Sequence, residues 1–253
     1  MNEAEQILRK RTMAAGGVAI VTGAARRIGR EIALALAEDG YAVLVHYGSS
    51  EASALEVVEQ IRNKGGLAMT VSADLAEPEL SATRICDAAC ELGSPTLLIN
   101  SAAVFEDLPL PQISPRHCLE HFTVNAIAPI LLAREFVARL PASAAGQIIS
   151  LLDWRALHPP TDHLVYTASK AALASITLTL AQQLAPQIRV NGIALGAILA
   201  PPGRADWHQQ RAAEQIPLRR HGTPRDVVSA LRFLISNDFM SGEILQLTGG
   251  EHL

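Results

Sequence analysis

A short segment in the second half of the chain holds three side chains that could transfer a proton together. It spans residues 153–170 and reads DWRALHPPTDHLVYTASK. Tyr166 and Lys170 are four residues apart, so on a helix they share one face. Asp153 follows the apolar run 148–152 and precedes the tyrosine by thirteen residues. A phenol, an ammonium and a carboxyl in this arrangement predict a group that delivers a proton to one reacting atom.

The elements that must position these side chains can be predicted from hydrophobic runs. Runs of strand length alternate with segments of helical period from residue 18 onward, and they are nearly continuous, as in parallel strands buried on both faces. The runs cover residues 18–22, 42–46, 67–72, 96–100, 147–152, 188–193 and 243–247. The helical segments cover residues 29–38, 52–64, 80–91, 117–140, 166–184 and 225–236. This order predicts an α/β Rossmann fold, a doubly wound seven-stranded parallel sheet with helices on both faces.

Length and composition fit a single domain of this kind. The chain has 253 residues, of which 49% are hydrophobic, enough for a sheet covered on both faces. Residues 1–16 are polar and lack the apolar centre of a secretory signal, so we expect a flexible extension before a domain spanning 17–253. No apolar run reaches the roughly 18 residues of a membrane span. The net charge of −4 offers no basic surface for nucleic acid.

The cysteines and histidines indicate neither a disulfide framework nor a metal site. Cys86, Cys90 and Cys118 are odd in number and form no CxxC pair, which favours a reducing, cytoplasmic compartment. His117, Cys118 and His121 lie close in sequence but lack a fourth ligand nearby. We therefore predict a cytoplasmic protein without a bound metal.

A glycine-containing turn after the first predicted strand could hold a pyrophosphate. Residues 22–29 read TGAARRIG and lead straight into a helix. Small residues let the backbone approach the phosphates closely, and the helix N-terminus favours their negative charge. The turn predicts a dinucleotide site that includes Gly23, Arg26, Arg27, Ile28 and Gly29.

The end of the second strand indicates which dinucleotide binds. NAD-binding folds usually carry an acid here for the ribose 2′-hydroxyl. In this chain no acid lies between the end of the second strand and Glu51. Guanidinium and hydroxyl groups suit a 2′-phosphate instead, so we predict NADP(H) rather than NAD(H). The residues expected around that phosphate are Arg26, Arg27, His46, Tyr47, Ser49 and Ser50.

Further cofactor contacts are expected where other strands end. An aspartate after the third strand can bond the adenine amine, and small residues after the fourth let the chain pass beneath the cofactor. The segment 196–215 follows the sixth strand and contains Pro-Pro-Gly, so we interpret it as a substrate lid. The additional residues expected to contact the cofactor are Asp74, Leu75, Asn100, Ser101, Ala102, Gly196 and Ile198.

In order and spacing these features resemble the short-chain dehydrogenase/reductase family over residues 18–253. The matching segments are TGAARRIG, NSAA at 100–103, Asn125, YTASK at 166–170, and RVN at 189–191 followed by Gly196. The resemblance implies that Tyr166 donates the proton, that Lys170 also holds the nicotinamide ribose, and that Asn125 anchors a water linking Lys170 to solvent. It also implies a homotetramer, with subunit contacts through helices 117–140 and 166–184.

Within this family the chain is most similar to the pteridine reductase and dihydromonapterin reductase branch. Arg27 stands where most members have Gly or Ala, and His46-Tyr47 with nearby serines ends the second strand. Asp153 replaces the usual catalytic serine while its spacing to the tyrosine is kept. This branch reduces pterins, so the likeness implies a pterin-like substrate.

Two features depart from that branch. Val104 occupies the position where pteridine reductases carry an aromatic ring that stacks on the pterin, and Phe105 comes one residue later. The usual Pro-Gly after the sixth strand is Leu195-Gly196. The first departure concerns the substrate, and the second concerns only loop geometry.

Asp153 distinguishes between substrate classes. A serine would hydrogen-bond a ketone oxygen as it becomes an alkoxide, whereas an ionised aspartate would repel that oxyanion. A protonated carboxyl, or one that relays a proton through Tyr166, suits a ring nitrogen that gains a proton as the adjacent carbon gains hydride. Lys170 should lower the phenol pKa of Tyr166 toward the working range. The alternative is that Asp153 only caps the end of the strand.

The sequence therefore predicts an NADPH-dependent reductase of a pteridine-like or related C=N heterocycle. A carbonyl or 3-oxoacyl ketone reductase is the alternative, which Val104 favours. Enoyl reduction fits less well, because that branch spaces its Tyr and Lys further apart. A non-catalytic NADP-binding protein is a third possibility, although such proteins commonly lose the Tyr or the Lys. The expected substrate site comprises Arg27, Val104, Phe105, Asp153, Trp154, Tyr166 and Trp207.

Overall fold

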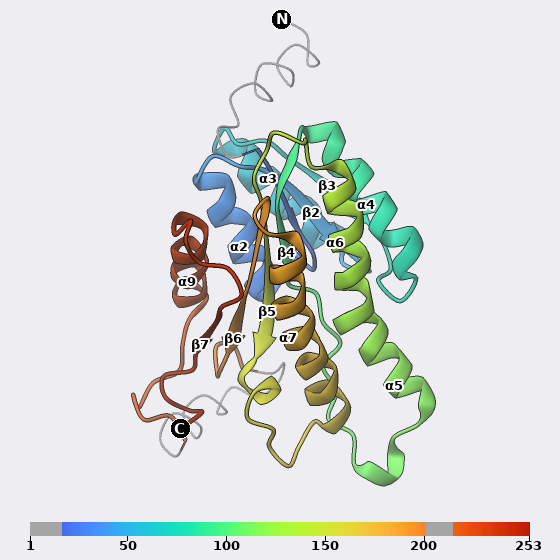
Figure 1. The fold of residues 1–253 in the computed structure, drawn as a ribbon, viewed down its shortest axis with the longest axis vertical. Coiled ribbons are helices and arrows are strands. Elements are labelled where there is room, and N and C mark those ends of the chain that lie inside the picture. The colour runs from blue at the N-terminus through green and yellow to red at the C-terminus, as the bar shows by residue number, and fades with distance from the viewer. Residues whose placement is uncertain (1–16, 201–214) are drawn as a thin grey trace, which may run out of the picture.

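The structure is a computed structural model that describes residues 17–200 and 215–253 (Figure 1). Its centre is a sheet of seven strands in the order β3-β2-β1-β4-β5-β6-β7, with every neighbouring pair parallel. The strands are β1 (Val18–Val21), β2 (Ala42–Tyr47), β3 (Ala68–Ser72), β4 (Pro95–Asn100), β5 (Gly146–Asp153), β6 (Ile188–Leu195) and β7 (Ile244–Leu247). The predicted doubly wound sheet is confirmed. The expected N-terminal extension and most of the expected lid, Trp207 included, lie outside the described residues.

Helices cover both faces of the sheet because successive strand residues point to opposite sides. Ala19 and Val21 of β1 belong to the cluster beneath α2, α3 and α9, whereas Val18 and Ile20 belong to the cluster beneath α4, α6 and α7. The first group comprises α2 (Arg27–Glu38), α3 (Glu51–Asn63) and α9 (Pro224–Ser236). The second comprises α4 (Pro78–Leu92), α6 (Ala128–Arg139) and α7 (Leu164–Leu184).

The helix predicted over residues 117–140 is interrupted. It consists of α5 (Pro115–Phe122), a π-helical turn η2 (Thr123–Ile127) and α6. Turns of this kind inside helices often occur at functional sites, because they turn one side chain out of the regular helical register. Asn125 lies within η2 and is fully buried.

Helix α7 is the longest helix in the described part of the chain, with 21 residues, and it carries Tyr166 and Lys170. Among the described residues it is the one helix long and apolar enough to cross a membrane by length and composition, although half of the relevant window is buried inside the protein. Its contacts with β5 and β6 are those of a core helix.

The strand order reverses between β1 and β4, which are neighbours in the sheet. In folds of this kind, ligands bind in the crevice beyond the carboxyl ends of the strands at such a switch point. Those ends lie toward the bottom of Figure 1, where β5 points. The glycine turn after β1, the segment after β4 and Asp153 at the end of β5 all lie at this edge of the sheet.

Candidate active site

The phenol and the carboxyl predicted to act together are in contact. Asp153 is the last residue of β5, and Tyr166 lies in the first turn of α7. The Tyr166 hydroxyl donates a hydrogen bond to Oδ2 of Asp153 at 3.2 Å. Tyr166 is only 6% exposed, so this bond lies in a protected environment. The strand end and the helix start thus bring together two residues thirteen positions apart.

Lys170 lies one helical turn after Tyr166 and is 3% exposed. Its Nζ donates a hydrogen bond of 2.7 Å to the backbone oxygen of Leu151 in β5. Burial lowers the pKa of Lys170 to about 8, and the negative charge of Asp153 opposes that shift. Most of the ammonium therefore persists at pH 7, as a proton-delivery group requires.

The phenol differs from the expectation that Lys170 lowers its pKa. Burial raises the pKa of Tyr166 well above its usual value, and the adjacent Asp153 carboxylate raises it further. Arg155 opposes these effects only weakly. In this arrangement Tyr166 keeps its proton and presents it to Asp153, so it is a hydrogen-bond donor and not a phenolate.

Arg155 is part of this site, and the sequence analysis did not identify it. It lies in the 3₁₀ turn η3 (Trp154–Ala156) directly after Asp153. Its backbone N–H donates to Oδ1 of Asp153 at 2.9 Å, and its Nη1 reaches the same oxygen at 3.4 Å. Its Nε reaches Oδ1 of Asp162 at 3.4 Å. The charge pattern Asp-x-Arg was the available signal in the sequence.

The side chain of Asn125 hydrogen-bonds two separate segments, at Val104 and at Ser169. Its Oδ1 accepts from the backbone N–H of Val104 at 2.9 Å, and its Nδ2 donates to the backbone oxygen of Val104 at 2.9 Å. The same Nδ2 donates to the Ser169 hydroxyl at 2.9 Å, which in turn donates to the backbone oxygen of Tyr166 at 2.7 Å. The π-helical turn thus ties the segment after β4 to the catalytic helix. The expected role of Asn125 in anchoring a water stays a prediction.

An aromatic ring borders the phenol, one residue later than in the pteridine reductases. Phe105 meets the Tyr166 ring edge-on, with ring centroids 4.6 Å apart, and stacks on His163 at 4.5 Å. Phe105 is 49% exposed, so part of its surface stays open. Val104 instead packs against the core cluster beneath α4 and α6.

Trp154 follows Asp153 and is half-buried. Its indole N–H is buried without a hydrogen-bond partner, and the Arg155 guanidinium lies 5.3 Å from the ring centroid. A buried indole N–H usually has a partner, so this donor is available to a ligand. The expected role of Trp154 in substrate binding stays a prediction.

The glycine turn after β1 is shaped for close approach of a phosphate. Gly23 has a positive φ of 64°, a conformation that favours glycine. A Cβ on Gly29 would meet the Gly23 backbone oxygen at 2.3 Å, so only glycine fits where α2 begins. Thr22, which the sequence analysis did not single out, accepts from the backbone N–H groups of Ser101 and Ala102 at 2.9 and 3.1 Å. Its hydroxyl fixes the turn to the segment after β4.

His46 differs from its predicted role as a phosphate contact. It is 2% exposed, its Nδ1 accepts from the Gly23 N–H at 3.0 Å, and its Nε2 lies 3.0 Å from the backbone oxygen of Ala73. An amide donor on one nitrogen and a carbonyl acceptor on the other require the neutral ring. Both nitrogens are occupied inside the protein, so His46 braces the glycine turn from beneath.

This bracing predicts a loss of stability in acid. Burial lowers the pKa of His46 from 6.5 to about 4. The unfolded chain therefore takes up a proton on His46 below pH 6.5 that the folded chain accepts only near pH 4, so the contribution is complete above pH 6.5 and is lost as the pH falls. Between pH 7 and pH 5 the loss should be about 2 kcal/mol.

Urea unfolding at the two pH values measures this effect, with His46→Asn as the control. The asparagine retains an oxygen acceptor for Gly23 but does not titrate in this range. The free energy of unfolding should fall less between pH 7 and pH 5 in the variant than in the wild type. Equal falls in both proteins would show that another group causes the acid sensitivity.

The two arginines of the turn point to different places. Arg26 donates from Nε to the Ser53 hydroxyl at 3.2 Å, in the first turn of α3 and close to the end of β2. Arg27 has a positive φ of 54° and donates from Nη2 to the backbone oxygens of Leu199 and Ala200 at 3.3 and 3.1 Å. Arg26 thus borders the region predicted for the 2′-phosphate, whereas Arg27 reaches across to the segment after β6.

The remaining predicted cofactor residues lie at the same edge of the sheet but differ in accessibility. Ser49 and Asp74 are exposed and Ser50 is half-buried, and Asp74 holds the Ala76 N–H at 2.9 Å with one of its two oxygens. The side chains of Tyr47, Leu75 and Ile198 are buried in the core, and that of Ile28 packs against it. Only the backbones of Leu75 and Ile198 are therefore positioned to meet a cofactor.

Asn100 and Gly196 flank the crevice at the ends of β4 and β6. Asn100 donates to the Ser150 hydroxyl at 3.3 Å, while its Oδ1 is buried without a partner. A Cβ on Gly196 would meet the Thr248 Cα at 2.8 Å, so the loop after β6 packs closely on the C-terminal segment.

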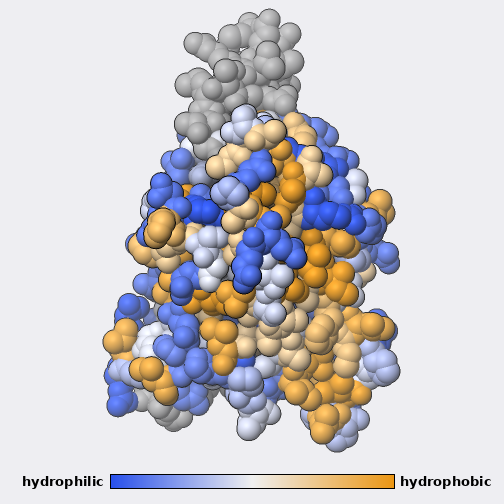
Figure 2. All heavy atoms as spheres, in the orientation of Figure 1, coloured by the Kyte–Doolittle hydropathy of each residue, from blue (hydrophilic) through white to orange (hydrophobic). Residues whose placement is uncertain are grey.

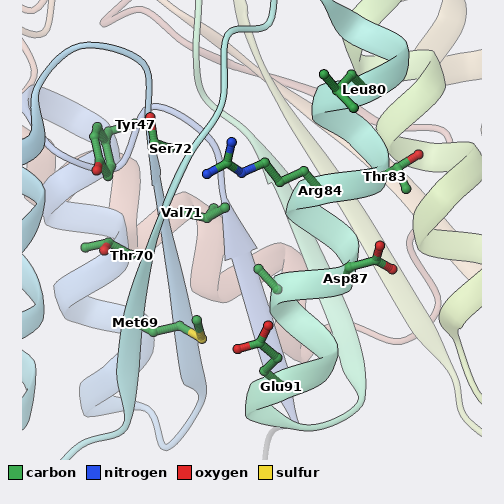
Figure 3. Close-up of a pocket in the computed structure, with 11 residues that line it drawn as sticks. Tyr47, Met69, Thr70, Val71, Ser72, Leu80, Thr83, Arg84, Asp87 and Glu91 are labelled. Carbon is green, nitrogen blue, oxygen red and sulfur yellow. The ribbon is translucent and has the colours of Figure 1, made fainter.

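A separate hollow of about 620 Å³ opens between β3 and α4 at the edge of the sheet (Figure 3). Arg84, Asp87 and Glu91 of α4 line it on one side, and Met69 and Ser72 of β3 on the other. None of the proton-transfer residues lines it. Tyr47, which the sequence predicts near the 2′-phosphate, also lines it, so the hollow is separate from the proton-transfer residues but borders the predicted cofactor region.

The residues at the crevice fit a phosphorylated dinucleotide. The glycine turn is closed to any Cβ at Gly29, the N-terminus of α2 lies directly behind it, and an exposed guanidinium flanks the end of β2. The buried Asn100 Oδ1 offers an unused acceptor beneath the crevice. The described residues contain no cluster of ligands that could hold a metal ion.

Comparisons with known proteins agree with this geometry. Residues 23–252 match the family model described as enoyl-(acyl carrier protein) reductase. A short-chain type dehydrogenase/reductase of Picea abies is 34% identical over 93% of this chain and 92% of its own. The 3-oxoacyl-[acyl-carrier-protein] reductase FabG of Staphylococcus epidermidis is 31% identical over 93% of this chain and 98% of its own. The solved structure of FolM alternative dihydrofolate reductase 1 from Brucella canis, complexed with NADP, superposes with a TM-score of 0.89 at 32% identity and covers 95% of both chains.

The family model covers the segment that carries Tyr166 and Lys170, and the matches to the relative and to the solved structure extend over more than nine tenths of both chains. The resemblance inferred from the motifs is thereby confirmed. The chain belongs to the short-chain dehydrogenase/reductase family of oxidoreductases.

Proposed function

We propose that this protein is an NADPH-dependent reductase of a pteridine-like or related C=N heterocycle. The observation that carries this proposal is the Asp153 carboxylate, which accepts from the Tyr166 hydroxyl and is paired with Arg155. An anion at this position disfavours an alkoxide and favours a substrate nitrogen that becomes N–H. The likeness to an alternative dihydrofolate reductase supports the same substrate class.

The chemistry divides between the cofactor and the chain's own residues. When bound, NADPH supplies a hydride to the ring carbon of the C=N bond. Tyr166 gives the proton that the adjacent nitrogen takes up, so the double bond becomes CH–NH. Asp153 turns from accepting the Tyr166 hydroxyl to accepting the new N–H, and the Lys170 ammonium stabilises the phenol oxygen that has lost its proton. Tyr166 and Lys170 are buried and the Asp153 side chain is 15% exposed, so little bulk water reaches this exchange.

The dinucleotide would lie across the carboxyl ends of the strands. Gly23 and Gly29 would admit the pyrophosphate, Asp74 the adenine amine, and Lys170 the nicotinamide ribose. Arg26, Ser49 and Ser50 would hold the 2′-phosphate, which is where NADPH differs from NADH. Solved relatives in this family carry NADP or NADPH, which supports the assignment.

Arg26→Ala should weaken the preference for NADPH. Loss of one charge-assisted contact to the 2′-phosphate should raise the KM for NADPH about 10- to 100-fold and leave the KM for NADH nearly unchanged. Arg27→Ala is the matched control, because that guanidinium contacts Leu199 and Ala200 instead. Steady-state kinetics with both cofactors would measure it. Equal KM values for NADPH and NADH in the wild type would rule out this role.

The substrate ring would stack beside Phe105. Phe105 touches the Tyr166 ring and keeps an open surface, so it can do what the aromatic residue at the Val104 position does in pteridine reductases. The Trp154 N–H offers a buried donor nearby in the chain. Arg27 would line the outer part of the site.

A panel of substrates tests the proposed function directly. NADPH oxidation is followed with dihydropterin, dihydrofolate, cyclic imines and ketones, each with wild type and with Asp153→Ala. We expect turnover of the C=N substrates by the wild type and its loss in the variant. Turnover of ketones alone, undiminished in Asp153→Ala, would contradict the proposal. NADPH binding without turnover of any substrate would instead support a non-catalytic role.

A ketone or 3-oxoacyl reductase is the second candidate. The FabG relatives are 3-oxoacyl-[acyl-carrier-protein] reductases, and their identity to this chain is close to that of the FolM structures. This reading requires that Asp153 be tolerated beside a developing alkoxide. The ketone arm of the panel distinguishes the two candidates.

We further propose that the protein is a cytoplasmic homotetramer. The three cysteines form no disulfide, which agrees with a reducing compartment. Hydrophobic side chains gather on the surface over α6 and α7 (Figure 2). The exposed large apolar residues of α5, η2, α6 and α7 are Leu119, Phe122, Ile127, Ile130, Val137, Leu164 and Leu178. Light scattering in solution measures the assembly, and a monomeric mass would refute it.

A further inference from the structure

Arg155 is more deeply buried than its residue type leads one to expect. Its side chain is 10% exposed and lies between two acids, Asp153 and Asp162. An arginine is almost never fully buried unless it is paired, because taking its charge out of water costs several kcal/mol. It cannot lose its proton in the working range. The two acids raise its pKa further, although burial alone would lower it. A permanent positive charge therefore sits beside the catalytic carboxyl.

The hydrogen bonds around Asp153 all have the same direction. Its Oδ1 receives the Arg155 backbone N–H and the Arg155 Nη1, and its Oδ2 receives the Tyr166 hydroxyl. Three donors and no acceptor surround the two oxygens in these bonds. A protonated Oδ2 would keep its bond to Tyr166 only if the phenol turned to accept, and the phenol would then no longer present its proton to Asp153. The two Arg155 donors on Oδ1 cannot reverse in this way, and together the three donors favour a carboxylate over a carboxylic acid.

We infer that Arg155 is a positioning and specificity-determining residue, which holds Asp153 as an oriented carboxylate and so selects substrates that present an N–H group. This inference rests on the proposed function and names the feature that determines its substrate class. A substrate nitrogen that gains a proton can replace the Tyr166 hydroxyl as the donor to Oδ2. A ketone oxygen brings no donor and gains negative charge against the same carboxylate.

The other charged groups near this pair make different contacts, so Arg155 is the cation that orients the Asp153 carboxylate. Lys170 lies on α7 and contacts the Leu151 backbone oxygen, so its ammonium does not bond Asp153 in the described structure. Asp162 and His163 lie in the loop before α7, where Asp162 reaches both Arg155 and His163. Asp107 reaches the His163 backbone N–H at 3.1 Å. Of these groups only Asp162 contacts Arg155, and within the described part of the chain Arg155 is the one cation that bonds Asp153.

The test compares Arg155→Met, Arg155→Lys and Asp162→Asn. R155M removes the charge and keeps most of the chain length, R155K keeps a charge without the planar fork, and D162N removes only the outer partner. The first readout is the pH dependence of kcat/KM with a C=N substrate. The acid side of this profile should differ between R155M and wild type, because R155M lacks the permanent charge beside Asp153. D162N should follow the wild-type profile on that side.

The second readout is the preference between substrates. R155M should lower kcat/KM for C=N substrates about 100-fold and lower that for ketones far less, because the carboxyl loses the guanidinium that orients it. R155K should recover most of the preference, within about tenfold of wild type. Equal losses in R155M and R155K with no movement of the acid limb would show a merely structural role and overturn the inference. If R155M does not fold, loss of the preference in R155K with intact NADPH binding overturns it as well.

A substrate-free measurement separates this inference from the proposed function. Carboxyl carbons labelled with ¹³C are titrated by NMR in wild type and in R155K or R155M, and the Asp153 signal is assigned by its absence in Asp153→Asn. A midpoint higher in the Arg155 variants supports the pairing, and an unchanged midpoint overturns it. If the midpoint moves but the wild type reduces only ketones, the proposed function fails while the Arg155–Asp153 pairing stands, and the role in substrate selection falls with the function.

Discussion

Tyr166→Phe should reduce kcat about 10²- to 10⁴-fold while NADPH binding stays within about threefold of wild type. Among the described residues the phenol is the one group that hydrogen-bonds Asp153 Oδ2, and its high pKa keeps the proton on the oxygen at neutral pH. Phenylalanine removes that proton and keeps the ring that meets Phe105. Steady-state rates with the preferred substrate and titration of NADPH fluorescence give the two quantities.

The contrast between these two quantities is what identifies Tyr166 as the proton donor. A variant that loses both turnover and cofactor binding would indicate a collapsed site, which thermal unfolding would reveal. A variant that keeps more than about a tenth of wild-type kcat would show that another group delivers the proton. Lys170 would then be the group to examine, since its pKa of about 8 leaves it partly deprotonated near neutrality.

The fold was predictable because its signals are local. Each strand is a short run of apolar residues, and the predicted and observed strand bounds differ by at most three residues. One predicted helix differs from the structure. The predicted helix 117–140 contains the π-helical turn η2, because Asn125 bonds Val104 and Ser169, which are 21 and 44 residues away in sequence. A helical period cannot report contacts that form only after folding.

The candidate site was predictable where its residues belong to family motifs. It was not predictable where adjacent residues direct their side chains to different places in the fold. Arg26 and Arg27 seemed equivalent in the glycine turn, but the positive φ of Arg27 sends its side chain away from α3. His46 seemed available to a phosphate, but the register of β2 places its ring between Gly23 and Ala73. The one sequence signal for Arg155 is the Asp-x-Arg charge pattern, and its role depends on contacts with Asp153 and Asp162 that form only in the fold.

Asp153→Ser should reverse the preference between substrates. Serine is the residue that most of this family carries here, and its hydroxyl can donate to an alkoxide. A carboxylate about 4 Å from a developing oxyanion costs about 4 kcal/mol at an effective dielectric constant of 20, which corresponds to about 10³-fold in rate. We expect kcat/KM for ketones to rise by about 10²- to 10³-fold and kcat/KM for C=N substrates to fall by at least 10-fold.

Asp153→Asn is the control that separates charge from hydrogen bonding. The amide keeps an oxygen for the Arg155 N–H and removes the negative charge, so it should relieve the repulsion of ketones without supplying the serine hydroxyl. We therefore expect D153N to lie between wild type and D153S in the ratio of ketone to C=N turnover. Both variants leave the Arg155 guanidinium with Asp162 alone, so they should be less stable, and rates are compared below their unfolding temperatures. Ratios within about threefold of wild type in both variants would mean that the charge of Asp153 does not govern substrate choice, and the C=N proposal would then lose its physical basis.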